Sequence, residues 1–351
     1  MKCAPIIIPT LNRIEHLKRC IDSLKENPLA LETDLYISVD YPPEEKYFEG
    51  YQLVKKYVTE ELKGGFRNIF YYIQSENLGP EMNFLFLKEK SIMSSNKAYI
   101  FTEDDNVFSP AFLDYINKSL IKYEKNEKIY RICGYSPLDT INDVQGDAFL
   151  LDYGCAWGIG VWREKEDIFE KWLTRDNFIL LLKDNDICES LYQRSYKKYW
   201  NLVETCLASP NENNNVFNSQ IDNNIRNIDY TVGLYLTIKG FYALFPRISL
   251  VKNEGFDGTG VNCGAGDFVD KDYVLYDRNS YNISEFLCLQ ESEEKEIFKD
   301  SENYLRAKKA RIFRRIFMIF GIGIARKAKE ICLYLEYKFY IVNKFVLSKE
   351  K

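Results

Sequence analysis

Three adjacent carboxylates, Glu103, Asp104 and Asp105, follow a short apolar run over residues 99–101. Acids so close together repel one another, and a divalent cation that prefers hard oxygen ligands would relieve this repulsion. Such a cation usually keeps water and ligand phosphates as its other ligands. The three acids therefore indicate a metal and phosphate site, with a solvated acidic turn as the alternative.

The neighbouring sequence places these acids between a strand and a helix. The run 99–101 is typical of a short buried strand. Ser109-Pro110 is a helix-start signal, because Pro tolerates the first turn and the hydroxyl can cap it. Open α/β sheets bind ligands at the carboxyl ends of their strands, so the acids stand where such a sheet would bind a ligand.

Strands and helices alternate before the acids. Three predicted strands are each followed by a predicted helix; the strands are residues 4–9, 34–40 and 68–74, and the helices 14–25, 44–62 and 80–91. This alternation predicts an α/β fold with a mostly parallel sheet flanked by helices. Neither GxGxxG nor GxxxxGK(S/T) follows any of these strands, so a nucleotide would not be held by a Gly-rich loop. A metal at the acids is the natural substitute for neutralising a diphosphate.

Four stretches, in this order, carry a resemblance to one family of enzymes: residues 4–24, 99–116, 153–162 and 246–260. The acidic stretch resembles the DxD-type metal motif of GT-A glycosyltransferases. The four together resemble bacterial family-2-like enzymes that are similar to the animal N-acetylglucosaminyltransferase I. The resemblance covers about residues 1–265 and implies a GT-A (Rossmann-like) catalytic domain over residues 1–285.

The resemblance implies a nucleotide-sugar site with a metal ion. Asp105 would coordinate Mn²⁺ or Mg²⁺, and Glu103 and Asp104 would position ribose or sugar hydroxyls. Trp157 and Gly158 would lie beneath the donor sugar and the acceptor. The other residues expected to bind the nucleotide-sugar are Pro9, Thr10, Asn12, Arg13, Asp40, Asn77 and Gly79.

Structural roles are the alternatives for several of these residues. Arg13 could be a surface residue in a first helical turn, Asp40 a turn residue, and Trp157 part of a buried strand. The Gly-rich residues 251–266 are typical of a mobile loop that closes over bound nucleotide, with a plain flexible loop as the alternative. The residues of this loop that would add contacts are Asn253, Phe256 and Asp257.

An inverting transfer needs one general base that deprotonates the acceptor hydroxyl. The resemblance implies a base on a helix upstream of a strand at residues 246–250. Asp229 holds that place best, and Asp222 is the second choice; more distant alternatives are Glu204 and Asp186. The structural reading of Asp229 is an acid that favours the N-terminus of a helix.

Composition separates the body of the chain from its C-terminal region. The chain has 351 residues, 46% hydrophobic and 28% charged, which is typical of a globular protein. Residues 304–351 hold 13 Lys and Arg against 3 Glu, a charge of +10, so the rest carries −15 of the net −5. An acidic body disfavours nucleic acid as a partner.

The C-terminal region, residues 286–351, is expected to be helical, basic and amphipathic. Its apolar run over residues 316–325 is too short to span a bilayer, which needs roughly 20 residues. Basic residues around apolar stretches indicate helices that lie on an anionic membrane surface. The alternative is a helical hairpin packed on the catalytic domain or on a second subunit of a homodimer.

The nine Cys include no CxxC pair, and the N-terminus leads straight into the first strand. Both features predict a cytoplasmic protein with reduced thiols, at the cytoplasmic face of the inner membrane where the C-terminal helices bind lipid.

The resemblance to GT-A glycosyltransferases implies a metal-dependent, inverting glycosyltransferase of bacterial surface polysaccharide synthesis. It would move a hexosyl or N-acetylhexosaminyl group from a nucleotide-sugar, with a UDP-sugar favoured, to a glycan or lipid-linked acceptor. The first alternative is a sugar nucleotidyltransferase, which would normally carry a Gly-rich basic first loop, whereas residues 9–13 contain no Gly. The second is a non-catalytic, membrane-associated scaffold.

Overall fold

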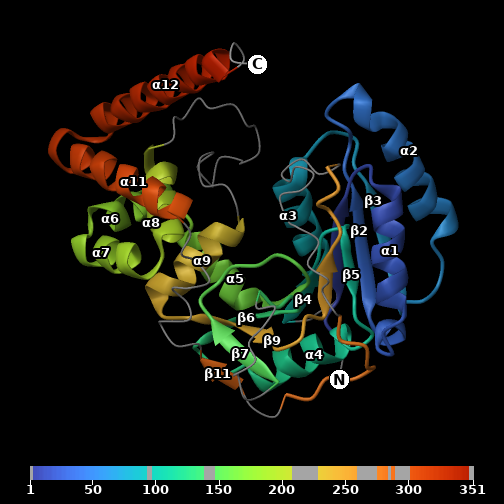
Figure 1. The fold of residues 1–351 in the computed structure, drawn as a ribbon. Coiled ribbons are helices and arrows are strands. Elements are labelled where there is room, and N and C mark those ends of the chain that lie inside the picture. The colour runs from blue at the N-terminus through green and yellow to red at the C-terminus, as the bar shows by residue number, and fades with distance from the viewer. Residues whose placement is uncertain are drawn as a thin grey trace. The chain divides into compact units, whose positions relative to one another are not determined.

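The computed structural model describes residues 3–92, 97–137, 147–207, 228–258, 275–283, 286–288 and 301–347. The chain divides into two compact units. Unit 1 comprises Met1–Lys171 and Thr231–Leu289, and unit 2 comprises Trp172–Tyr230 and Gln290–Lys351. Figure 1 labels the elements of both units.

Unit 1 is built on a sheet whose described strands number nine, in the order β11-β7-β9-β6-β8-β4-β1-β2-β3. β1 is parallel to β2 and to β4, and β2 is parallel to β3. β6 and β9 are also parallel, whereas β8 runs antiparallel to both β4 and β6. The predicted mixed α/β class with a mostly parallel sheet is confirmed. The strands are β1 (Ile6–Thr10), β2 (Asp34–Val39), β3 (Asn68–Ile73), β4 (Ala98–Phe101), β6 (Ile129–Cys133), β7 (Ala148–Leu151), β8 (Ile159–Trp162), β9 (Tyr242–Pro246) and β11 (Phe286–Cys288).

Helices cover both faces of this sheet. α1 and α2 lie on one face and α3 on the other (Figure 1), because the chain steps outward from β1 to β3 and then returns to β4. The central strands are therefore buried, and residues 6–8 of β1 are fully inaccessible. The helical segments are α1 (Ile14–Lys25), a 3₁₀ turn (Ala30–Glu32), a second 3₁₀ turn (Glu45–Tyr47), α2 (Phe48–Lys56), a π turn (Tyr57–Glu61), α3 (Gly79–Ile92), α4 (Phe112–Lys122), α5 (Arg163–Trp172) and α9 (Ile228–Lys239).

The structure corrects the sequence prediction at one place that matters for the site. A short strand, β5 (Asn106–Phe108), stands between the acids and α4, and it pairs antiparallel with β10 (Val251–Asn253). The strand expected at residues 246–250 is wrong, since β9 ends at Pro246, the first residue of this stretch, and β10 begins after it. The Ser109 hydroxyl accepts the Ala111 N–H at 3.2 Å, and α4 begins only at Phe112. β7 is a further strand that was not predicted from the sequence.

Unit 2 is helical in its described residues. Its helices are α6 (Arg175–Lys183), α7 (Asn185–Arg194), α8 (Tyr196–Leu207), α11 (Ser301–Phe320) and α12 (Ile322–Leu347). Of the C-terminal region predicted to be helical, residues 301–320 and 322–347 form α11 and α12, whereas residues 286–288 form strand β11 of the unit 1 sheet. Helices from residues 172–207 join it in one compact unit, and the expected assignment of catalysis to residues 1–285 stays a prediction, because compactness does not say which part is catalytic.

Among the helices in the described ranges, none is both long enough and apolar enough to cross a membrane.

Candidate functional site

The candidate site lies where the strand order of the unit 1 sheet reverses. β1 has β2 on one side and β4 on the other, so the helices after β1 and before β4 lie on opposite faces. Such a reversal opens a crevice at the carboxyl ends of the strands, which is where open α/β sheets bind ligands. Thr10 ends β1 and Arg13 lies in the loop after it, and the loop after β4 carries the three acids.

The two loops meet through an ion-pair network. The Arg13 guanidinium bonds to Asp104 Oδ1 through one nitrogen, and its other terminal nitrogen lies 2.9 Å from Asp105 Oδ2. The Thr10 hydroxyl donates to Asp104 Oδ2 at 2.6 Å. The Asp104 and Asp105 side chains are only 6% and 10% exposed. Four residues predicted from the sequence are thus brought into direct contact.

The electrostatics of this network leave it short of positive charge. Burial raises the pKa of Asp104, and the Asp105 carboxylate raises it further, while Arg13 acts in the opposite direction. Burial tends to lower the pKa of Arg13, but the two carboxylates outweigh this effect and raise it above its ordinary value. One guanidinium faces two carboxylates, so the cluster retains one negative charge that a bound cation would neutralise.

A strap formed by residues 253–257 encloses Asp105. The Asn253 side chain donates to Asp105 Oδ1 at 2.9 Å, and the Glu254 N–H donates to the Asp105 carbonyl at 2.8 Å. A Cβ at Gly255 would stand 2.2 Å from Asp105 Oδ2, so only glycine allows this approach. The pairing of β5 with β10 brings the strap here, across almost 150 positions of sequence.

Two residues of α1 hold the strap in place. Arg19 Nε donates to the Glu254 carboxylate at 2.7 Å. His16 Nε2 lies 3.2 Å from the Glu254 carbonyl oxygen and 3.2 Å from Asp257 Oδ2. Neither residue was predicted from the sequence. The only sequence signal for them is that they lie one helical turn apart on the helix that follows the first loop.

Asp40, which follows β2, accepts hydrogen bonds from the predicted residues that follow β3. Its carboxylate accepts the N–H groups of Leu78 and Gly79 at 2.8 Å each, and the N–H of Tyr41 at 2.9 Å. The Asn77 amide donates to it at 3.3 Å. Burial raises the pKa of Asp40, and the backbone hydrogen bonds lower it. A carboxylate accepts about four hydrogen bonds, so contact with a nucleotide base would require one donor to move, and that contact stays a prediction.

The Trp157–Gly158 pair borders the strap. The Trp157 ring contacts Tyr135 and Phe256 edge-on, at centroid distances of 4.7 and 5.8 Å. Gly158 has a φ of +61°, and a Cβ there would stand 2.8 Å from Val251 Cγ2. Gly158 is therefore required by conformation and packing, whereas Trp157 is half-buried and shares its environment with the strap.

The remaining predicted residues have the following positions. Pro9 lies in β1, and Asn12 packs against Gly50, whose added Cβ would meet the Asn12 carbonyl at 2.3 Å. Glu103 is half-buried. Asp229 belongs to the first turn of α9, but its side chain lies outside the described residues, as does all of Asp222. The distant alternatives Asp186 and Glu204 are exposed on α7 and α8 of unit 2.

The donor atoms at the reversal point fit a hard divalent cation that also takes ligands from water and phosphate. Asp104 and Asp105 supply carboxylate oxygens, which Mn²⁺ and Mg²⁺ prefer. Among the described residues, no group of three or more His, Cys, Asp or Glu side chains could hold a metal by itself. A cation here would therefore depend on a ligand that supplies further oxygens.

Comparisons with known proteins found likenesses only at the level of structure. No protein-family model matches the chain, and no curated protein sequence matches it. The chain is similar to S. aureus TarS at 13% identity and a TM-score of 0.26, over 40% of this chain and 26% of that one. The structure of S. aureus TarS 1-349 is 13% identical, with a TM-score of 0.33, over 48% of this chain and 49% of that one.

A third similar structure is the mannosyltransferase PcManGT from Pyrobaculum calidifontis in complex with GDP-Man and Mn²⁺. It is 13% identical, with a TM-score of 0.31, over 46% of this chain and 44% of that one. The chain thus spans less than half the length of each of these structures.

Proposed function

We propose that this chain is a metal-dependent, inverting glycosyltransferase that uses a nucleotide-sugar, with a UDP-sugar favoured. One observation carries the proposal: Thr10 and Arg13 meet Asp104 and Asp105 at the reversal point of a mostly parallel sheet. Two buried carboxylates and one guanidinium at such a point combine the groups that a cation and a diphosphate require.

Each group of the network has a distinct task in this proposal. Asp105 would hold Mn²⁺ or Mg²⁺, and Asp104 and Glu103 would position ribose or sugar hydroxyls. The cation would supply positive charge to the leaving diphosphate when it is bound. Arg13 would share its donors between the acids and the phosphate oxygens, because a guanidinium presents five N–H groups in a planar fork.

The strap would shield the reacting centre from water. Gly255 lies directly against Asp105, and Phe256 lies against Trp157, so a sugar bound beside Asp105 would be covered from this side. Exclusion of water protects an activated sugar from hydrolysis and strengthens the electrostatic interactions around it.

Acceptor activation requires a base that faces the sugar on the side opposite the leaving group. We assign this role to Asp229 of α9, with Asp222 as the second choice. Removal of the acceptor proton as its oxygen attacks the anomeric carbon would invert the configuration there. The acceptor would be a glycan or a lipid-linked glycan of bacterial surface polysaccharide synthesis, and the transferred group a hexose or N-acetylhexosamine.

The experiment is a turnover assay with UDP-sugars and Mn²⁺ in which the nucleotide product is identified. Release of UDP that depends on Mn²⁺ supports the proposal, whereas release of pyrophosphate in a parallel assay with nucleoside triphosphates and sugar 1-phosphates assigns the site to a sugar nucleotidyltransferase instead. Asp105→Asn should abolish turnover, whereas the matched control Asp22→Asn, whose side chain is 69% exposed on α1, should retain it. No turnover of any nucleotide-sugar, with or without metal, would favour the scaffold.

A further inference from the structure

Helix α11 of unit 2 presents two apolar faces, and only one of them is buried. Ala307, Ala310 and Phe317 are buried in unit 2. On the opposite side, Leu305, Ile312 and Ile319 are 58%, 57% and 71% exposed. They repeat every seven residues, which places them on one face of the helix. This exposed row has no role in the packing of the helix.

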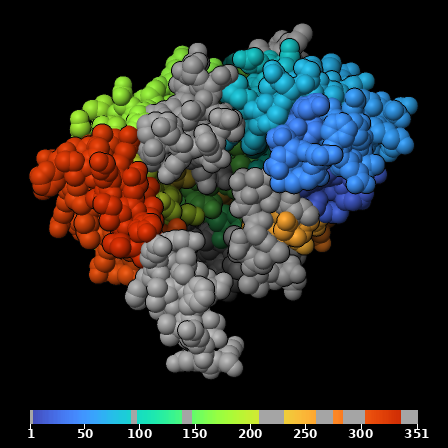
Figure 2. Space-filling view, turned by 90° about the horizontal axis from the view of Figure 1, so that it is seen from above, coloured from blue at the N-terminus to red at the C-terminus, as the bar shows by residue number. Residues whose placement is uncertain are grey.

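Helix α12 also exposes apolar side chains. Ile324, Ile331 and Leu335 are 52%, 60% and 60% exposed, with spacings of seven and four residues that again fall on one helical face. We call the two rows the exposed apolar rows of α11 and α12. Parts of both helices are seen at the surface, in orange and red, in Figure 2.

The sequence around these rows is strongly basic. Residues 304–336 contain nine Lys and Arg against two Glu. At least three of the nine contact other residues of unit 2: Arg311 pairs with Glu189 at 2.7 Å, Arg314 Nε donates to the Leu182 carbonyl at 2.8 Å, and Arg306 lies over the Trp200 ring at 5.0 Å. Lys308, Arg315 and Lys327 are exposed and belong to the same helices as the rows.

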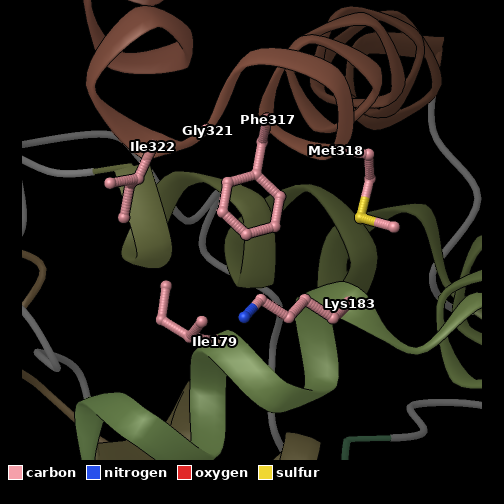
Figure 3. A pocket seen from close by; sticks show the side chains of 6 residues that line it. All are labelled: Ile179, Lys183, Phe317, Met318, Gly321 and Ile322. Atoms are coloured by element: carbon pink, nitrogen blue, oxygen red, sulfur yellow. The ribbon is translucent and has the colours of Figure 1, made fainter.

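A pocket of about 550 Å³ lies at the junction of α11 and α12. Phe317, Met318 and Ile322 enter it from these helices and face Ile179 and Lys183 of α6 (Figure 3). It is an open hollow, since Lys183, Met318 and Gly321 of its lining are exposed. Apolar walls with one ammonium group suit an amphiphile that has an apolar chain and an anionic head group.

We propose that α11 and α12 bind an anionic lipid surface, with the exposed apolar rows inserted among the lipids and the pocket holding an acyl chain. Charge decides between this occupant and a second copy of the chain. Two copies joined through these rows would bring like charges together, whereas anionic lipids are complementary to the Lys and Arg residues. Lipid binding by unit 2 does not depend on the chemistry proposed for unit 1.

The test is flotation of the full chain with vesicles of phosphatidylcholine and phosphatidylglycerol at a ratio of 70:30, against vesicles of phosphatidylcholine alone. The chain should float with the mixed vesicles and bind them at least tenfold more tightly than the neutral ones. The double variant Ile312→Asp/Ile319→Asp should lose at least tenfold in affinity. The control Leu31→Asp, at a residue 70% exposed in unit 1, should bind as the wild type does.

Two further variants examine charge and the pocket. Lys308→Gln/Arg315→Gln should weaken binding severalfold, since each basic residue near an anionic surface contributes to binding. Lys183→Glu should do the same, whereas Lys171→Glu on α5 should not. Equal binding by wild type and by Ile312→Asp/Ile319→Asp would overturn the proposal. A dimer that this double variant dissociates, without any vesicle binding, would assign the rows to a second copy and would overturn it as well.

Discussion

Arg13→Gln is the substitution that examines the site network most sharply. Arg13 is the only cationic side chain shown to contact both Asp104 and Asp105 among the described residues. Removing one partner of a buried ion pair costs about 3–5 kcal/mol, because a charge is left buried without compensation. We take about 3 kcal/mol, since the Arg13 side chain is 19% exposed.

This loss corresponds to a large shift in thermal stability. A change of 1 kcal/mol moves the Tm by roughly 2–4 °C in a domain of 150–250 residues, so Arg13→Gln should lower it by roughly 6–12 °C. The control Arg19→Gln removes an Arg–Glu254 pair whose arginine is 48% exposed. Such a pair contributes at most about 1 kcal/mol, so the control should change the Tm little.

Manganese provides the decisive comparison in the same melting experiment. A divalent cation at Asp105 would restore the positive charge lost with Arg13, so Mn²⁺ added together with UDP, whose phosphates supply further oxygen ligands, should raise the Tm of Arg13→Gln more than that of the wild type. Binding at a hundredfold excess over Kd contributes about 2.7 kcal/mol, which would recover most of the loss. A variant as stable as the wild type, or an equal Mn²⁺ effect on both, would refute the reasoning.

Two other predictions concern packing and pH. Gly255→Ala would place a Cβ 2.2 Å from Asp105 Oδ2 and should destabilise unit 1 by about 1–3 kcal/mol in denaturant unfolding. The control Gly323→Ala in α12, where a Cβ would meet nothing within 4 Å, should not destabilise the chain. Equal effects of the two substitutions would contradict the enclosure of Asp105. Burial lowers the pKa of Lys165 from 10.5 to about 8. Between these values the folded lysine is neutral and the unfolded one charged, so unfolding takes up a proton and stability should rise with pH. Measured relative to Lys165→Met, the wild type should gain stability from pH 8 to 10.5, and a flat difference would contradict the shift.

Local patterns predicted much of the fold. The apolar run predicted β1, and the apolar spacing of residues 17, 21 and 24 predicted α1. Both patterns are visible because burial of strands and helix faces is periodic in sequence. The three acids were found for a similar reason, since their position after a strand places them at an edge of the sheet. The signals for these features are contained within a few neighbouring residues.

What the sequence did not reveal depends on contacts between distant segments. β5 and β10 are three residues each, too short to show a period, and their pairing joins residues 106–108 to 251–253. Without that pairing, nothing in the sequence brings Asn253 and Gly255 to Asp105, or the strap to His16 and Arg19. The grouping of residues 172–207 with the C-terminal helices is likewise a long-range packing effect that helical periodicity does not specify.

The most direct test of the central claim is calorimetric titration of the chain with UDP, with and without Mn²⁺. The account predicts binding that requires Mn²⁺, that weakens at least a hundredfold in Asp105→Asn, and that persists in the control Asp22→Asn. The same dependence for GDP, dTDP or CMP would change the donor but not the site. Binding of none of these nucleotides, or metal-independent binding retained in Asp105→Asn, would contradict the proposed nucleotide–metal site.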